Sequence, residues 1–130
     1  MDPLDYIRKA EKVLSRFDNI DYAFLFGSVL NHPGPESDVD ILVGGDLDFS
    51  GRASLAMELG LELKKDVDIV LTKEARCELV LNALSRGIPI LVYDEDIVKR
   101  DYFKSYHQQE QNVGLRKLRI ERMKRRYGLG

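Results

Sequence analysis

The sequence lacks the features that would indicate a secreted, membrane-bound or thiolate-metal protein. Cys77 is its only cysteine in 130 residues, so an internal disulfide and a cysteine metal cluster are both excluded. No hydrophobic run approaches the roughly 20 residues that a membrane-spanning helix needs. The N-terminal stretch mixes acidic and basic residues instead of forming a secretory signal. These absences predict a cytoplasmic protein without a membrane segment, in which Cys77 has no chemical role.

Composition favours one compact domain followed by a distinct extension. Hydrophobic residues make up 44% of the chain, which suffices for one core but not for two. Residues 1–98 contain 10 Lys or Arg and 19 acids, a net charge of −9, whereas residues 99–130 contain 10 and 3, a net charge of +7. We therefore expect a globular domain over residues 1–98 and a basic helical extension over residues 99–130.

Hydrophobic periodicity predicts a mixed α/β (α+β) fold, a short mixed sheet flanked by helices. Helices are expected over residues 3–16, 52–63 and 73–86, and strands over 22–26, 38–43, 67–71 and 88–93. Thr72 is expected to cap the third helix and Gly87 to end it, while Pro89 indicates either a sheet edge or a position among the first residues of the last strand. Asn112 and Gly114 are expected to interrupt the C-terminal helix.

A Gly-Ser pair follows the first predicted strand. Gly27 has no Cβ, so the backbone there can approach a phosphate group closely, and a short helix that opens at this point presents free amides. Ser28 adds a hydroxyl to the same site. The alternative interpretation makes Ser28 an ordinary helix N-cap.

Two pairs of alternating acids begin the next two predicted strands. Asp38 and Asp40 are separated by one apolar residue, as are Asp66 and Asp68. Residues two apart in a strand point to the same face, and magnesium prefers such hard oxygen ligands. We expect Asp38, Asp40 and one of the second pair to hold a divalent cation. Asp68 is favoured over Asp66 because apolar residues flank it on both sides. The competing interpretation treats the acids as solvated charges.

These motifs together carry a family resemblance. The order G-S, nine residues, D-V-D-I and later V-D-I-V resembles the nucleotidyltransferase superfamily related to DNA polymerase β. The short chain is similar to its minimal nucleotidyltransferase group, and within it to the MntA-type antitoxins paired with HEPN toxins. The resemblance covers roughly residues 4–95. It implies that Gly27 and Ser28 grip a nucleoside triphosphate, and that Asp38, Asp40 and Asp68 are catalytic and bind magnesium.

The resemblance also implies an activity and a partner. Paired magnesium ions would neutralise the attacking and leaving oxygens of nucleotidyl transfer. Members of the family use ATP to transfer AMP to a tyrosine hydroxyl of the cognate HEPN toxin, with the third acid assisting the acceptor hydroxyl. The base preference itself rests on the resemblance alone. One departure is that Val29 and Leu30 follow the Gly-Ser pair where many relatives have Arg or other polar residues.

Two alternatives from other classes remain open. One is a nucleotidyltransferase that modifies a small hydroxylated molecule, its pocket completed in a homodimer. The other is a non-catalytic antitoxin-like module that masks its partner. The basic extension packs on its own domain or a second copy, docks on a partner protein, or, least favoured, contacts nucleic acid. The spacing of Arg100 and His107 echoes that of HEPN ribonucleases, but a single helical stretch cannot form a HEPN bundle, so we interpret it as chance.

Overall fold

The computed structural model of the chain describes residues 3–27 and 38–126, with side chains described over 4–27 and 38–111. Its elements are α1 (Pro3–Leu14), β1 (Ile20–Phe26), β2 (Val39–Gly45), α3 (Phe49–Leu63), β3 (Val67–Leu71), α4 (Cys77–Arg86), β4 (Ile88–Val92) and α5 (Glu95–Arg126). The strand order is β3-β2-β1-β4. Strand β1 is antiparallel to β2 and β4, while β2 and β3 are parallel. The predicted mixed sheet flanked by helices is confirmed.

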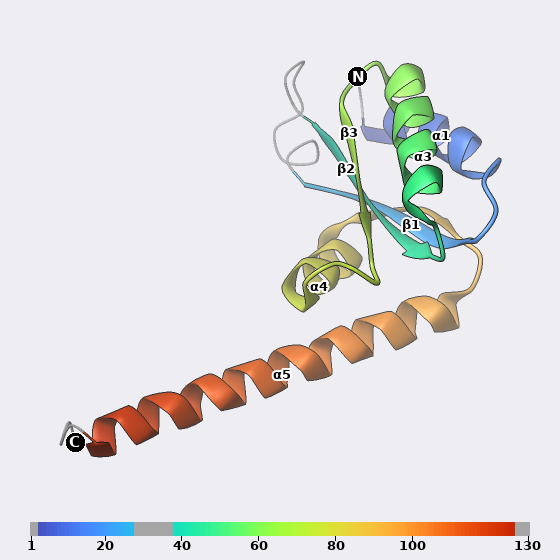
Figure 1. Cartoon of the computed structure of the whole chain (residues 1–130). Coiled ribbons are helices and arrows are strands. Elements are labelled where there is room, and N and C mark those ends of the chain that lie inside the picture. Colours follow the sequence, from blue (N-terminus) through green and yellow to red (C-terminus); the bar gives the residue numbers. More distant parts are fainter. Residues whose placement is uncertain (1–2, 28–37, 127–130) are drawn as a thin grey trace.

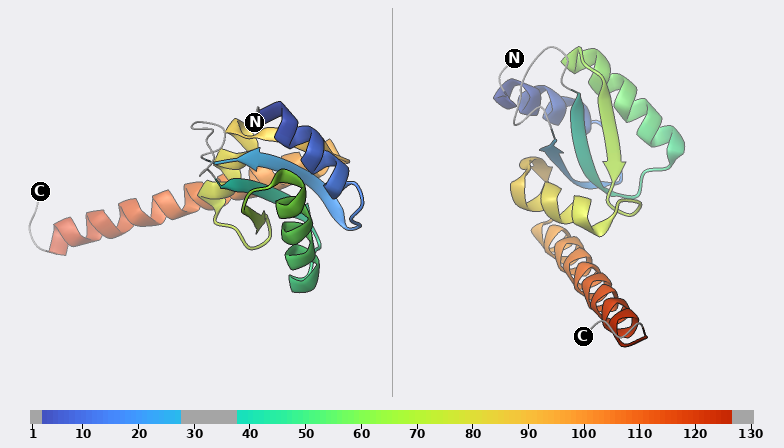
Figure 2. Two further views of the ribbon diagram at one scale, coloured as in Figure 1. Left: turned by 90° about the horizontal axis from the view of Figure 1, so that it is seen from above. Right: turned by 90° about the vertical axis from the view of Figure 1, so that its left-hand side faces the viewer.

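Helices cover both faces of the sheet (Figures 1 and 2). On one face, α1 and α3 pack against alternate residues of the two central strands, among them Ala23 and Leu25 of β1 and Ile41 of β2. On the other face, α4 and the start of α5 pack against the residues between them, Tyr22 and Phe24. The alternation follows from the two-residue period of a strand, and it places β1 and β2 at the centre of the core.

Strand β4 lies at the edge of the sheet, where Pro89 is tolerated because the edge needs no further hydrogen-bond donor. The predicted edge position of this strand is therefore confirmed. The predicted strand 67–71 matches β3, and the other strands differ from their predicted bounds by at most two residues at each end.

Two helix starts differ from the sequence prediction. Helix α4 begins at Cys77, four residues later than expected, and Thr72 does not cap it. The amides of Glu74 and Ala75 both donate to the Leu71 carbonyl at 3.0 Å, which forms a turn before the helix. Helix α3 begins earlier than expected because the carboxylate of Asp48 accepts from its first turn.

Helix α5 is continuous from Glu95 to Arg126, so the interruption expected at Asn112 and Gly114 is wrong. A single glycine costs a helix only about 1 kcal/mol relative to alanine, which the surrounding helix-forming residues offset. The domain boundary predicted between residues 98 and 99 falls inside this helix. Ile97 and Val98 pack against the core, Asp101 contacts Tyr22 of β1, and the distal part of α5 extends away from the sheet (Figure 1).

Candidate functional site

The parallel pairing of β2 and β3 brings two predicted acids side by side. Asp40 on β2 is the direct register partner of Asp68 on β3, and the neighbouring pair is Val39 and Val67. Direct partners in a parallel pair present their side chains on the same face. Asp38 lies two residues before Asp40 and so belongs to that face as well. The sheet register thus collects acids that are up to 30 residues apart in the chain.

These carboxylates differ in their surroundings. Asp38 and Asp68 are exposed, whereas Asp40 is half-buried. Burial, followed by the negative charges of Asp68 and Asp38, raises the pKa of Asp40 above its ordinary value. The same electrostatic repulsion would be relieved by a bound cation. Asp66 precedes β3, and its carbonyl accepts a hydrogen bond from the Val39 amide at 3.0 Å.

Gly27 lies directly against Asp40. It follows β1 with φ +88°, and a Cβ atom built on it would lie 2.2 Å from Oδ2 of Asp40. The pairing of Phe26 with Asp40 across β1 and β2 explains this proximity. Sequence reasoning predicted that Gly27 lets the backbone approach a phosphate, and the structure shows that it also makes room for a carboxylate. Ser28 lies outside the described residues.

The donor set suits a divalent cation in charge and in atom type. All three acids offer hard carboxylate oxygens, which Mg²⁺ prefers. Among the described residues, however, no set of three or more His, Cys, Asp or Glu side chains is placed to hold an ion together. Asp38 and Asp68 are both exposed to solvent.

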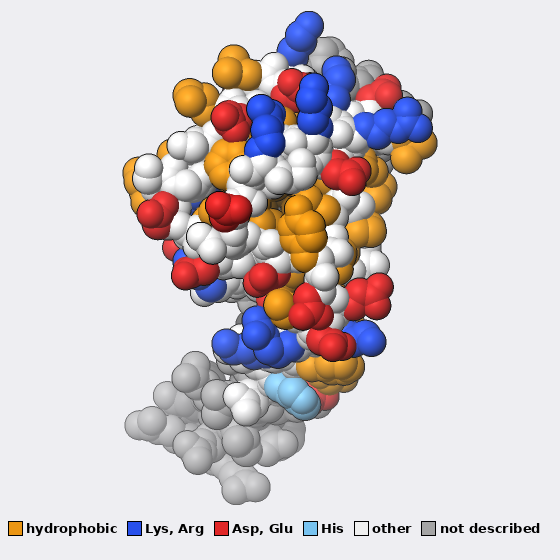
Figure 3. All heavy atoms as spheres, turned by 90° about the vertical axis from the view of Figure 1, so that its right-hand side faces the viewer, with side chains coloured by type: hydrophobic (Ala, Val, Ile, Leu, Met, Phe, Trp, Pro, Cys, Tyr) orange, Lys and Arg blue, Asp and Glu red, His pale blue; other side chains and the backbone are white. Residues whose placement is uncertain are grey.

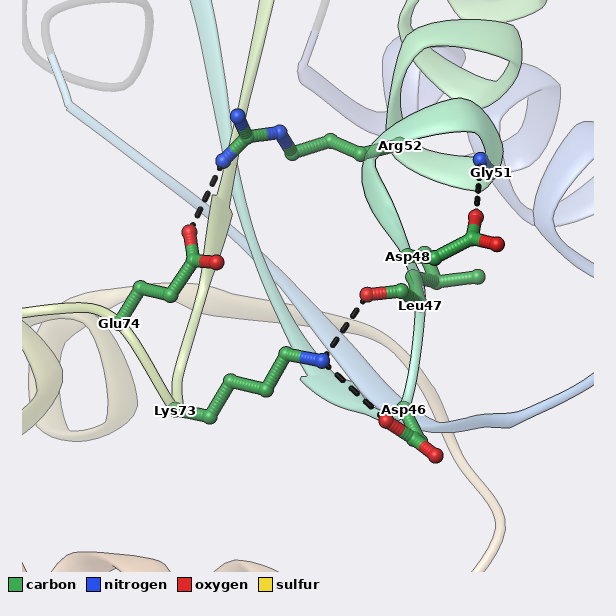
Figure 4. Close-up of polar contacts among 7 residues, drawn as sticks. All are labelled: Asp46, Leu47, Asp48, Gly51, Arg52, Lys73 and Glu74. Atoms are coloured by element: carbon green, nitrogen blue, oxygen red, sulfur yellow. Dashed lines mark hydrogen bonds and ion pairs between the residues drawn. The ribbon is translucent and has the colours of Figure 1, made fainter.

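A polar network at the opposite ends of the same strands was not anticipated from the sequence. The ammonium group of Lys73, after β3, donates to Asp46 and to the Leu47 carbonyl after β2, at 3.2 and 3.0 Å (Figure 4). Arg52 of α3 donates to Glu74 at 3.0 Å. Lys73 therefore joins the two loops that follow the parallel strands, and Arg52 joins α3 to the second of these loops.

A second network connects the sheet to α5. The hydroxyl of Tyr22, which is fully buried, donates to Asp101 of α5 at 2.8 Å and lies 2.7 Å from the Thr72 hydroxyl. Burial raises the pKa of Tyr22, so its hydroxyl remains a donor. A polar cavity of ≈440 Å³ lies beside this network, and its lining includes Lys73 and Lys104. No local sequence motif signals these contacts, because their partners are 50 and 79 residues apart.

Comparison with known proteins identifies the class to which this fold and site belong. The family model described as polymerase beta, nucleotidyltransferase matches residues 8–96. The chain therefore belongs to the polymerase-β nucleotidyltransferase family, as the Gly-Ser and paired-aspartate motifs predicted. No curated protein sequence matches the chain.

Solved structures with a similar fold come from toxin–antitoxin complexes. A chain in a crystal structure of a toxin–antitoxin with AMP-PNP is 25% identical, with a TM-score of 0.75 over 90% of this chain and 97% of the other. A chain in the toxin–antitoxin MntA–HepT is 23% identical, with a TM-score of 0.72 over 92% and 97%. A chain in a complex of tri-AMPylated HEPN toxin with MNT antitoxin, from Shewanella oneidensis, is 23% identical, with a TM-score of 0.71 over 92% and 97%. The fold is thus shared along almost the whole of both chains.

Within the described residues, no helix is both long and apolar enough to span a membrane. The longest, α5, has 32 residues but a polar composition.

Proposed function

We propose that the protein is a magnesium-dependent adenylyltransferase that transfers AMP from ATP to a tyrosine hydroxyl of a HEPN-domain toxin and thereby neutralises it. The observation that carries the proposal is the contact of Gly27 with Asp40 and the register pairing of Asp40 with Asp68, inside a nucleotidyltransferase domain. The choice of nucleotide and acceptor is supported by the similar structures, one with AMP-PNP and another with an AMPylated HEPN toxin.

Asp38, Asp40 and Asp68 would hold the magnesium ions, two in number by the family resemblance. Bound magnesium would supply charge neutralisation at the attacking oxygen and at the leaving pyrophosphate. Gly27 would bring the backbone close to the triphosphate at the same point where it contacts Asp40, and Ser28 would add its hydroxyl. This arrangement couples the nucleotide grip to the metal-binding strand, because one glycine touches both.

The chemistry needs one bond made and one broken. The tyrosine oxygen bonds to the α-phosphorus of ATP, the bond from that phosphorus to pyrophosphate breaks, and the hydroxyl proton passes to a carboxylate. Asp68 is the acid that suits this last role, since it is exposed at the strand edge of the site and lies beside Asp40. Orientation of the hydroxyl and electrostatic stabilisation supply the remaining catalysis.

The openness of the site favours a macromolecular acceptor. Asp38 and Asp68 are exposed, and β3, which carries Asp68, is the edge strand of the sheet. Pockets for small substrates bury most of the ligand surface, whereas two of the three acids here are exposed to solvent. A protein acceptor would enclose them with its own surface.

The proposal is tested by intact-mass spectrometry of a HEPN-domain partner after incubation with the full chain, magnesium and each nucleoside triphosphate separately. We expect a mass increase equal to one or more AMP groups with ATP, and none with the Asp38→Ala/Asp40→Ala variant. Asp68→Ala and Asp66→Ala form a matched pair, of which only the first should abolish the transfer.

Each contrary outcome has a distinct meaning. A stable complex without a mass increase would contradict the transferase and indicate a masking module, particularly if the double variant still neutralises the toxin. Transfer to small hydroxylated molecules but not to the partner would contradict the protein acceptor alone. Loss of transfer in Asp66→Ala but not in Asp68→Ala would show that the third acid is Asp66.

A further inference from the structure

The candidate site lies at one end of the sheet, where β1 ends and where β2 and β3 begin. In the strand order β3-β2-β1-β4, Asp68, Asp40 and Gly27 belong to successive strands at this end. The fourth strand, β4, also begins here, because Ile88 pairs with Leu25, two residues before Gly27. The chain just before β4 therefore lies beside Gly27, on the side away from the acids.

Helix α4 ends at this point, on the face of the sheet that carries the acids. Phe26 is the register partner of Asp40, so both side chains lie on one face, and Phe26 packs against the cluster that α4 forms with the sheet. The helix ends at Arg86, and the chain there passes close to β1: a Cβ atom built on Gly87 would lie 2.8 Å from the Leu25 carbonyl oxygen. Arg86 thus lies at the site end of α4, on the same face as Asp40.

The side chain of Arg86 is available for a ligand. It is exposed, and its guanidinium group makes no hydrogen bond or ion pair with any residue that the structure describes. Adjacent strands are about 4.8 Å apart, so β4 lies about 10 Å from β2. An extended arginine side chain reaches about 7 Å from its Cα atom. The guanidinium group can therefore reach a ligand that extends from Asp40 past Gly27.

A phosphate ligand at this site needs a positive side chain, because the acids around it are negative. The segment 28–37, which connects β1 to β2, contains no Lys or Arg. Lys and Arg side chains gather over the α1 and α3 side of the molecule (Figure 3), but those helices cover the other face of the sheet. Arg100 and Lys104 of α5 line the polar cavity beside Asp46, at the far end of β2. The face and the end of the sheet both favour Arg86.

Two lysines precede β3 at the site end and are the competing candidates. Lys65 lies over the ring of Tyr6 of α1, with its Nζ 6.0 Å from the ring centroid, and so belongs to the other face of the sheet. Lys64 is exposed and forms the C-cap of α3, which also covers that face. Both lie on the β3 side of the acids, whereas Arg86 lies on the Gly27 side.

We propose that Arg86 binds the terminal phosphates of the nucleoside triphosphate, which runs from the acids of β2 and β3, past Gly27, toward the end of α4. The reacting α-phosphate would lie beside the carboxylates. The planar guanidinium group suits two parallel hydrogen bonds to phosphate oxygens, and its charge would stabilise the pyrophosphate as it leaves. The inference rests on the proposed function, because it takes the nucleotide as the ligand.

Isothermal titration calorimetry of the full chain tests the proposal with magnesium and α,β-methylene-ATP, an analogue that cannot release pyrophosphate. We expect Arg86→Gln to weaken binding by about tenfold or more, which is the value of a hydrogen bond to a charged group. Arg86→Lys should retain part of the affinity. Arg76→Gln, at the exposed N-cap of the same helix, is the matched control and should leave binding unchanged.

Two further measurements separate phosphate binding from a structural role. AMP lacks the terminal phosphates, so wild type and Arg86→Gln should bind it equally. A positive charge at a helix C-terminus also stabilises the helix through its dipole. If that were the only role of Arg86, Arg86→Gln would unfold at a lower urea concentration and bind the analogue as wild type does.

The outcomes distinguish this inference from the proposed function. Wild-type affinity in Arg86→Gln would overturn the inference, as would an equal loss of AMP binding, or a loss in Lys64→Gln in place of Arg86→Gln. A wild-type chain that does not bind the analogue would contradict the nucleotide site and the role of Arg86 together. The expected loss in Arg86→Gln without any transfer to a HEPN partner would contradict the acceptor and support the role of Arg86.

Discussion

Replacing Gly27 with alanine tests whether the contact with Asp40 matters for activity. Gly27 has φ +88°, a left-handed conformation that costs a residue with a Cβ about 1–2 kcal/mol. The added Cβ would lie 2.2 Å from Oδ2 of Asp40, so the carboxylate must move by about 1 Å or more to reach ordinary van der Waals distance. A displacement of about 1 Å in a catalytic group can lower the rate by about a hundredfold.

We therefore expect Gly27→Ala to lose about 1–2 kcal/mol of unfolding free energy and about a hundredfold in the rate of nucleotide transfer. Urea denaturation followed by circular dichroism measures the first quantity, and initial rates with saturating partner measure the second. Gly60→Ala is the matched control. Its Cβ would meet only the Lys65 carbonyl oxygen, in a tight contact at 3.3 Å, so its unfolding free energy should change by no more than about 1 kcal/mol in either direction, and it should keep full activity. Wild-type rates in Gly27→Ala would refute the role given to this contact.

Three further predictions concern stability. The pKa of Asp40 is raised in the folded state, so its proton stabilises the fold below the ordinary pKa, and that contribution is lost as pH rises through the raised value. Asp40→Asn should therefore unfold at a higher urea concentration than wild type at pH 7 but not at pH 3. An equal gain in stability at both pH values would contradict this. Tyr22→Phe removes the donor to Asp101 and should cost about 1–3 kcal/mol and speed amide exchange at the start of α5. Arg52→Ala breaks an exposed ion pair with Glu74 and should change unfolding by less than about 1 kcal/mol; a larger loss would show that the pair is more than a surface contact.

Much of the fold could be predicted because its signals are local. The alternation of apolar residues located the strands, and Pro89 identified an edge strand. The start of α4 was missed because Thr72 resembles a cap in the sequence, whereas its hydroxyl contacts Tyr22, 50 residues away. The continuity of α5 through Gly114 was missed because a glycine weakens a helix without dictating its end.

The candidate site, too, could be predicted from the sequence only in part. The acids themselves could be found from their spacing, since residues two apart share a face of a strand. Their alignment across β2 and β3 depends on sheet register, which no local pattern specifies. Nor could the sequence reveal that Gly27 touches Asp40, because that contact joins the end of β1 to the start of β2.

The parallel register of β2 and β3 makes the site sensitive to changes in chain length rather than in composition. Inserting or deleting one residue in β3 before Asp68 would reverse the face of every later side chain in the strand. Ile69 would then lie on the Asp40 side of the sheet, and Asp68 would point into the core. A change in the length of the loop after Leu63 would not reverse these faces, because β3 could keep its register with β2. Divergent sequences with this fold should therefore conserve the spacing inside the two strands strictly, while their length varies in the connections between elements.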